Sequence, residues 1–186
     1  MKRIFTLLST ALLFLVFSTA SKAQIFVKLV DGSGNTINGE STDAKHPNEI
    51  NATTFGQENT GCAGNVGSGS GGGASCGGTA GHFIFNMNVN ASLPLLDQAV
   101  FAGTHLRSAD IVFRKATQEY YTIHLESVMI SHVTNSVDPT TGAIAVQVEL
   151  AADKMGWTYN PQKADGAPGT PVKFGWDATT RSAWSF

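Results

Sequence analysis

Apolar and polar residues alternate along most of the chain, and this period of two predicts a protein built mainly from β-strands. The clearest case is His82–Val89, in which Phe83, Phe85, Met87 and Val89 fall on one face. Ile144–Leu150 alternates as cleanly. The other predicted strands are Gln24–Val30, Glu49–Phe55, Ala109–Arg114, Tyr120–Val133, Met155–Tyr159 and Pro171–Trp176.

Two of these strands depart from simple alternation. In Gln24–Val30, Phe26 stands between apolar residues that point the other way, so both faces of this strand are expected to be partly covered. In Tyr120–Val133 the inward positions end at Leu125 and resume at Val128. Such a slip predicts a β-bulge near Ser127, because an extra residue shifts the side chains that follow to the other face.

A change to helical spacing predicts one short helix in the middle of the chain. Leu96, Val100 and Phe101 are predicted to form one apolar stripe on it. Pro94 suits the first turn, where its missing N–H would have no partner in any case. Gly103 is the predicted end, since glycine adopts the left-handed conformation without steric cost. A short helix cannot bury its stripe alone and must dock on the sheet.

These elements define the expected fold class. We expect a mainly β protein, an antiparallel β-barrel or sandwich of about eight strands, with one short α-helix lying across it.

The N-terminal segment has the pattern of a secretory signal peptide. Basic residues precede an apolar run over 5–17, and a small-x-small cleavage motif ends at Ala23. The run is too short for a membrane anchor. We therefore expect cleavage between Ala23 and Gln24, with residues 1–23 as the signal peptide and residues 24–186 as one secreted or periplasmic domain.

The formal charge excludes two classes of partner. The chain carries −2, and the predicted signal peptide contains three basic and no acidic residues, so the mature part carries −2 − 3 = −5. A protein of this charge is not expected to bind nucleic acid, and once the signal is removed no segment is expected to bind a membrane.

The two cysteines, Cys62 and Cys76, both lie in the glycine-rich stretch 58–81, which is predicted to be a flexible insertion. An even number of cysteines in an exported chain favours a disulfide between them. The alternative is a zinc site with His82 as a third ligand, but the paired C-x-x-C or H-x-x-x-H spacing of such sites is absent. A phosphate-binding loop is excluded because no Lys-Ser or Lys-Thr pair follows the glycines.

No active site is visible in the sequence. The five histidines, at 46, 82, 105, 124 and 132, lack a metal-binding spacing with a carboxylate, and His124 points outward on its strand toward solvent. The polar run Ser41-Thr42-Asp43 is interpreted as loop residues bonding their own backbone rather than as a nucleophile. There is no Gly-x-Ser-x-Gly motif. We therefore predict no catalytic, metal-binding or cofactor-binding residues and no enzymatic activity.

Several short blocks occur in a fixed order along the chain. They are Gly39-Glu40-Ser41-Thr42-Asp43 followed by His46, then Pro94-Leu95-Leu96 with Gly103 and His105, Ile111–Lys115, Tyr121–Val128, Tyr159–Gln162, and Gly175-Trp176-Asp177. Together they resemble the haemolysin-coregulated protein (Hcp) family, the tube protein of type VI secretion systems. The resemblance covers nearly all of 24–177.

The resemblance implies a structural protein rather than an enzyme. It implies a β-barrel subunit that assembles into a homohexameric ring, rings that stack into a tube, small effectors carried in the lumen, and contact with a secretion spike. The motif residues become candidates for assembly: Gly39, Glu40, Ser41, Thr42, Asp43, His46, Gly175, Trp176 and Asp177. The loops 38–48 and 160–170 are candidates for stacking, against the alternative of ordinary solvated loops. The helix is a candidate for lining the lumen, against the alternative of capping the core.

A second hypothesis follows from the signal peptide, which tube proteins of this family normally lack. The chain would then be an exported binding module that uses the fold as a monomer or as a single ring.

Overall fold

The computed structural model describes residues 23–60, 79–164 and 166–186. Within them it contains nine strands and one helix. In chain order these are β1 Ala23–Asp31, β2 Thr36–Ile37, β3 Ile50–Thr60, β4 Thr79–Asn88, α2 Leu93–Ala102, β5 His105–Lys115, β6 Gln118–Val137, β7 Ile144–Tyr159, β8 Val172–Asp177 and β9 Ser182–Ala183.

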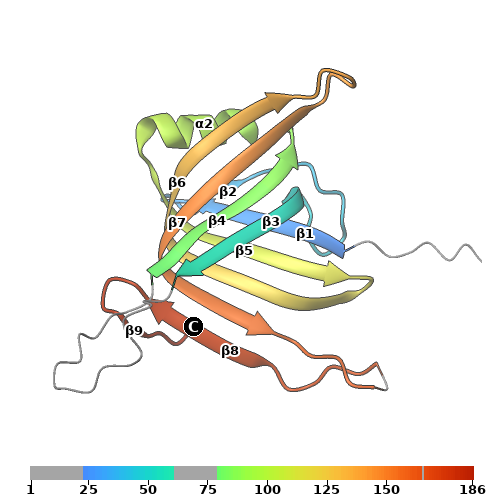
Figure 1. The fold of residues 1–186 in the computed structure, drawn as a ribbon, viewed down its shortest axis with the longest axis vertical. Coiled ribbons are helices and arrows are strands. Elements are labelled where there is room, and N and C mark those ends of the chain that lie inside the picture. The colour runs from blue at the N-terminus through green and yellow to red at the C-terminus, as the bar shows by residue number, and fades with distance from the viewer. Residues whose placement is uncertain (1–22, 61–78, 165) are drawn as a thin grey trace, which may run out of the picture.

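Six antiparallel strands close on themselves as a barrel (Figure 1). Their order is β4-β3-β1-β5-β6-β7, and β7 pairs back with β4. β8 and β9 continue the sheet beyond β7, outside the closed ring. The mainly β class with one short helix is confirmed.

β7 is one strand where the sequence predicts two. Its first part pairs with β4, from Ala145 to Leu150, and its second part pairs with β8, from Lys154 to Tyr159. Both parts pair with β6 without a break in the strand. The two predicted strands Ile144–Leu150 and Met155–Tyr159 are therefore one strand. Its first part belongs to the barrel, and its second part belongs to the extension formed with β8.

The barrel interior is filled by the apolar residues of the alternating strands. These side chains form one cluster, from which water is almost completely excluded. Its largest fully buried members inside the barrel are Phe83, Phe85, Leu29, Ile50, Met87, Leu96, Leu106, Ile111, Ile123, Leu125 and Leu150.

Helix α2 follows the prediction at its ends but differs in one residue of its apolar face. Gly103 adopts the left-handed conformation, with φ 60°, and its amide donates to the Val100 carbonyl. Leu96 and Ala99 are buried, whereas Phe101 is 90% exposed. At about 100° per residue, Phe101 lies about 140° around the helix from Leu96, so the predicted stripe is wrong at this position. No helix among the described residues is long and apolar enough to cross a membrane.

The change of face predicted near Ser127 is present in β6, but the β-bulge predicted there is wrong. Pairing with β5 and β7 keeps one register from Glu126 to Val128, and the register shift against β7 lies between Ile130 and His132. Ile123 and Leu125 are buried, and the buried positions then resume at Val128 and Ile130. Ser127 between them is exposed and has a φ of 51°. This positive φ is where the side chains change face.

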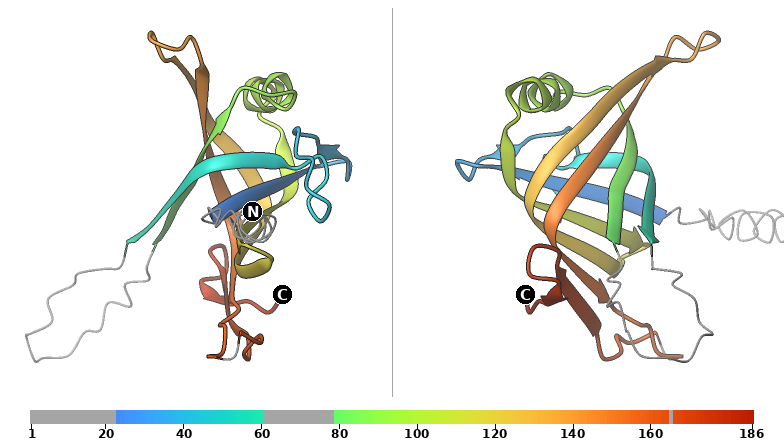
Figure 2. Two further views of the ribbon diagram at one scale, coloured as in Figure 1. Left: turned by 90° about the vertical axis from the view of Figure 1, so that its right-hand side faces the viewer. Right: turned by 60° about the vertical axis from the view of Figure 1, so that its left-hand side comes forward.

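The stretch 58–81, predicted to be a flexible insertion, is ordered β-structure at both ends. Asn59 pairs with Ala80, and Thr60 pairs with Thr79, so β3 and β4 continue beyond the barrel as a two-stranded arm. Figure 2 shows this arm leaving the barrel. The expected Cys62–Cys76 disulfide and most of the glycine-rich run lie outside the described residues.

Candidate functional site

The loop that carries the motif Gly39–Asp43 folds tightly back on itself between β2 and β3. The Gly39 amide donates to the Asn48 carbonyl (2.8 Å), and the Asn48 amide donates to the Ser41 carbonyl (2.8 Å). Gly39 is buried, and a Cβ there would stand 2.5 Å from the Glu49 carbonyl oxygen. The motif glycine is therefore required by a close approach of two backbone segments.

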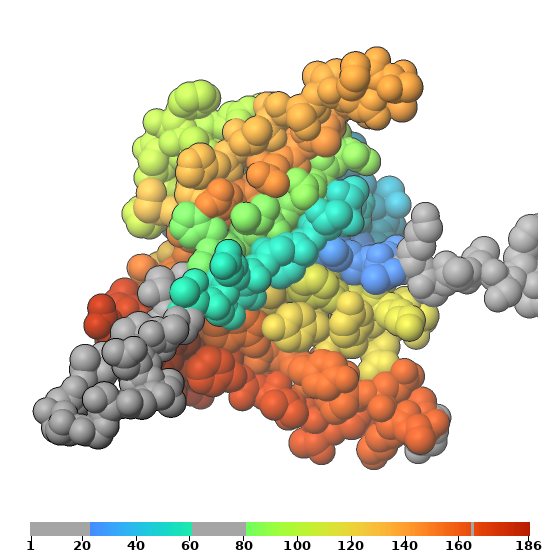
Figure 3. Space-filling view, viewed as in Figure 1, coloured from blue at the N-terminus to red at the C-terminus, as the bar shows by residue number. Residues whose placement is uncertain are grey.

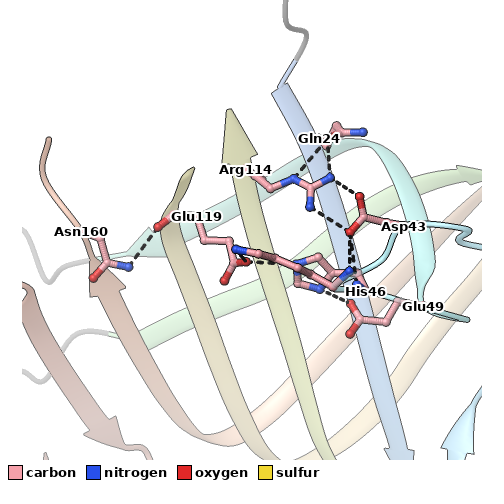
Figure 4. Close-up of polar contacts among 8 residues, drawn as sticks. Gln24, Asp43, His46, Glu49, Arg114, Glu119 and Asn160 are labelled. Atoms are coloured by element: carbon pink, nitrogen blue, oxygen red, sulfur yellow. Dashed lines mark hydrogen bonds and ion pairs between the residues drawn. The ribbon is translucent and has the colours of Figure 1, made fainter. Parts of the chain in front are cut away.

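Asp43 and Arg114 fasten this loop to the barrel wall (Figure 4). Arg114 Nη1 donates to Asp43 Oδ1 at 2.8 Å, and Nη2 donates to Oδ2, so the pair is bidentate. Nη2 also donates to Gln24 Oε1 at 2.7 Å, joining β5 to the start of β1. The guanidinium holds the pKa of the Asp43 carboxyl well below its usual range, chiefly by hydrogen bonding.

His46 lies beneath the same loop and covers the outer face of β1. Its ring stacks on Phe26 at 4.2 Å between centroids and is only 6% exposed. Nδ1 lies 3.0 Å from Glu49 Oε2, and Nε2 lies 3.5 Å from Glu119 Oε1. Burial raises the pKa of Glu49, although His46 opposes this. Phe26 is 1% exposed, so the expectation that both faces of β1 are covered is confirmed.

The remaining motif residues also make contacts within the chain. Ser41 is buried, and its Oγ accepts a bond from the Asp43 amide (3.2 Å), as the loop interpretation predicts. Glu40 Oε1 accepts from the Ala91 amide (3.1 Å) just before α2. Thr42 is exposed, and its backbone bridges to Pro47. The motif thus fixes the loop against β1, β5 and the helix entry, and a nucleophilic role for Ser41 finds no support in this geometry.

Loss of the Asp43–Arg114 pair is expected to release the loop. In Asp43→Asn the amide keeps one acceptor but loses its charge and the bidentate bond. We expect trypsin to cut after Lys45, an exposed residue of the loop, several-fold faster than in the unmodified protein. Thr42→Ala, at an exposed position of the same loop, is the control and should leave the rate unchanged. Equal rates in all three proteins would show that the pair does not hold the loop.

His124 points outward as predicted, but other groups cover much of it. Nδ1 lies 2.5 Å from Asp110 Oδ1, and the ring stacks with Trp184 and Phe186. The hydrogen bond to Asp110 raises the pKa of His124 above its ordinary value, more than burial lowers it.

This environment predicts how His124 titrates. Its raised pKa contributes stability that is fully present below the unfolded value of about 6.5 and is lost as the pH rises through the folded value. A proton NMR titration should place the midpoint for His124 above 6.5 in the intact protein and lower in Asp110→Asn. A midpoint that is the same in both proteins would contradict the assigned cause.

Exposed apolar side chains gather where the sheet extends beyond the barrel. Tyr159 is 49% exposed, Val172 64% and Phe174 55%, and strand pairing puts them on one face of β7 and β8. Trp157 stacks on Phe174 at 5.6 Å and donates to Gln57 of β3 (3.1 Å). Among the described strands, none pairs with the outer edge of β8 at Val172–Phe174. We call these three exposed residues, Tyr159, Val172 and Phe174, the β8 patch.

Several of the remaining titratable side chains line a hollow or pair with one another. Within the part of the chain that the structure describes, no group of three or more His, Cys, Asp or Glu residues could hold a metal ion. A hollow of about 860 Å³ is lined by both signs of charge, including Arg107, His124, Glu126 and Asp153. His82, the possible third zinc ligand, contacts Glu149, and both cysteines lie outside the described residues.

Comparison with known proteins gives the family. The sequence profile described as "Type VI secretion system effector, Hcp" matches residues 26–159, more than two thirds of the chain. The chain belongs to the Hcp family. Proteins of this family are components of type VI secretion systems, so the resemblance carried by the motif blocks is confirmed.

Individual Hcp proteins agree with this assignment. Protein hcp1 of Pseudomonas aeruginosa is 35% identical over 98 residues, which is 50% of this chain and 60% of that relative. The alignment thus spans less than two thirds of the curated relative's length. Among solved structures, one titled as a type six secretion system protein has a TM-score of 0.77 and 18% identity, covering 88% of this chain and 100% of its own. Hcp1 from Salmonella typhimurium has a TM-score of 0.67 and 24% identity, covering 87% and 99%. These two structures support the fold.

The last motif of the Hcp resemblance, Gly175-Trp176-Asp177, lies beyond the matched range. Gly175 is buried, and a Cβ there would stand 2.1 Å from the Trp184 carbonyl oxygen. Trp176 packs against the core, and Asp177 Oδ1 accepts from the Thr179 amide (2.8 Å). All three residues therefore have roles within the subunit. Trp184, which is half-buried, and the β8 patch, which contains two exposed aromatic residues, were not singled out from the sequence.

Proposed function

We propose that this chain is a structural, ring-forming component of a type VI secretion system that assembles as a homohexamer. The observation that carries the proposal is the Hcp family match over 26–159. The fold supports it, because the barrel presents two different flanks, and a head-to-tail contact between unlike flanks makes a ring when the rotation closes.

The β8 patch is the surface that best fits one side of this contact. It places two aromatic-rich strands beside an edge without a described partner, so a neighbouring copy would find both apolar side chains and free backbone groups there. The mature part has a predicted net charge of −5, and copies of like charge do not attract one another electrostatically. Apolar contact is therefore the expected source of affinity.

The ring proposal is tested by the mass of the protein in solution. Size-exclusion chromatography with light scattering at micromolar concentration should give about six subunit masses, and negative-stain images should show annuli. A monomer at every concentration would remove the ring and favour the exported binding module.

Stacking of rings, carriage of small effectors in the lumen and contact with a secretion spike belong to the same proposal. The loop 160–170, which leads from β7 to β8, remains the better candidate for stacking, because the loop 38–48 is largely engaged with its own subunit. Filaments of stacked annuli in the negative-stain images would support this, and single annuli at all concentrations would limit the protein to one ring.

Export through a cleaved signal peptide is the second part of the proposal. Cleavage after Ala23 would remove only the first residue of β1 and would keep Gln24, which pairs with Arg114. Mass analysis of the exported protein should give an N-terminus at Gln24 and no free thiol at Cys62 or Cys76. Retention of Met1 in the exported protein would contradict the signal peptide.

A further inference from the structure

The outer face of β6–β8 carries a shallow groove with a floor of two glycines. Cross-strand pairing aligns His124, Gly156 and Gly175 side by side on three neighbouring strands. The two glycines have no side chains, so the sheet surface is lowered beside the His124 ring. Both glycines are buried although they lie on the outside of the barrel, which means that something covers them.

The cover is the segment that follows β9. A Cβ on Gly156 would stand 2.5 Å from the ring of Phe186, so this ring fills the place of the missing side chain. The Trp184 amide donates to the Gly175 carbonyl (2.9 Å), which sets the backbone of the segment against β8. Figure 1 shows this end of the chain beside β8 and β9.

The groove holds the aromatic rings of Trp184 and Phe186, which are separated by one residue in the sequence. The rings of Trp184 and Phe186 lie 5.3 Å apart, and His124 stacks with both at 6.0 and 6.2 Å. Lys154 lies over the Trp184 ring at 5.5 Å, and Lys173 lies over the Phe186 ring at 5.1 Å. Each ring is thus held by stacking and by a cation, and both contacts require an aromatic side chain.

The segment is attached to its own subunit by a short connection. β9 has only two residues, each paired with β8. The turn before it contains Arg181 with φ 52°, a conformation that a non-glycine residue adopts at a cost. The aromatic residues contribute nothing to the barrel core, so they can leave the groove without opening it.

We propose that this groove binds the segment Ser182–Phe186 of a second copy of the chain in place of its own, so that neighbouring copies exchange C-terminal segments. The same segment from another copy makes the same contacts, so exchange sacrifices none of them and can relieve the turn at Arg181. The contact is head-to-tail and does not use the β8 patch, so it stands or falls separately from the hexamer.

The first test uses a variant that lacks residues 182–186 and therefore has an open groove. A fluorescein-labelled peptide of residues 178–186 is the probe, and its binding is followed by fluorescence anisotropy. We expect saturable binding at least tenfold tighter to the deletion variant than to the intact protein, whose groove is occupied. Binding that is equally weak to both, with the thermal unfolding of the deletion variant unchanged, would overturn the proposal.

The second test uses exchange between two variants. Gly156→Val fills the groove but keeps the segment, whereas the deletion variant keeps the groove but has no segment. The affinity-tagged deletion variant should capture Gly156→Val at least tenfold more than it captures a matched control that combines Gly156→Val with the deletion. A contact within the proposed ring would capture Gly156→Val and its control equally. Equal capture of the two proteins would therefore overturn the proposed exchange of segments without contradicting the proposed hexamer. If Gly156→Val fails to fold, Gly156→Ala replaces it, since its Cβ already meets the Phe186 ring.

Discussion

Leu96→Ala is expected to lower the free energy of unfolding by about 2–5 kcal/mol, the usual loss for a fully buried leucine. Leu96 is 0% exposed and belongs to the core cluster, which it reaches from helix α2. Truncation removes its transfer free energy and leaves a cavity, because the barrel strands around it are hydrogen-bonded on both sides and cannot collapse onto it. Urea denaturation followed by circular dichroism measures the difference.

Phe101→Ala is the matched control on the same helix. Phe101 is 90% exposed, so removing its ring should change the free energy of unfolding by no more than about 0.5 kcal/mol. A loss below about 1 kcal/mol for Leu96→Ala would mean that α2 does not close the core, and a larger loss for Phe101→Ala would mean that the exposed ring has a partner.

The strands of the barrel could be predicted because their side chains face two different environments. In β4, Phe83, Phe85 and Met87 are buried as their alternation indicates, whereas Val89, which follows the end of the strand, is 47% exposed and its predicted burial is wrong. The continuity of β7 was hidden because Ala151–Lys154 carries neither alternation nor bulky apolar residues. Pairing with β6 holds this segment extended, and a long-range hydrogen-bond ladder of this kind leaves no local pattern.

The motif loop shows a different limit of sequence reasoning. Its residues identified the family, but their positions suggested an outer loop that is free to contact another ring. In the structure Asp43 bonds to Arg114, which is 71 residues away, and His46 is buried on Phe26. From the sequence alone, a polar run in a loop is interpreted as exposed to solvent, because the distant residues that bind it cannot be identified. The helix face is a smaller example, because Val100 and Phe101 are neighbours in sequence but only one of them packs on the core.

The β8 patch and the aromatic residues that follow β9 were not predicted from the sequence. Pro171–Trp176 was predicted as a strand, but which of its faces is covered depends on how far the barrel reaches. Figure 3 shows the extension of β7 and β8 below the body of the barrel. There, residues on the barrel's interior face no longer have a wall opposite, so Phe174 is 55% exposed although Trp176 on the same face packs against the core.

Phe174→Asp is expected to convert the proposed hexamer into monomers at micromolar concentration. A carboxylate in the middle of the β8 patch would have to be desolvated against an apolar partner surface, and the aromatic anchor would be lost at the same time. Light scattering should then give one subunit mass in place of about six. Val137→Asp is the matched control, because Val137 is 63% exposed at the end of β6 and lies outside the patch.

Circular dichroism must show that both variants keep the thermal unfolding of the intact protein, which is expected because neither side chain is buried. If Phe174→Asp stays hexameric, the ring closes through another surface. If Val137→Asp also dissociates, the contact extends to the β6–β7 hairpin, which projects beyond the barrel in Figure 3. Dissociation of Phe174→Asp alone would place the contact between subunits on β8, where the sheet leaves an edge that no described strand of the same subunit covers.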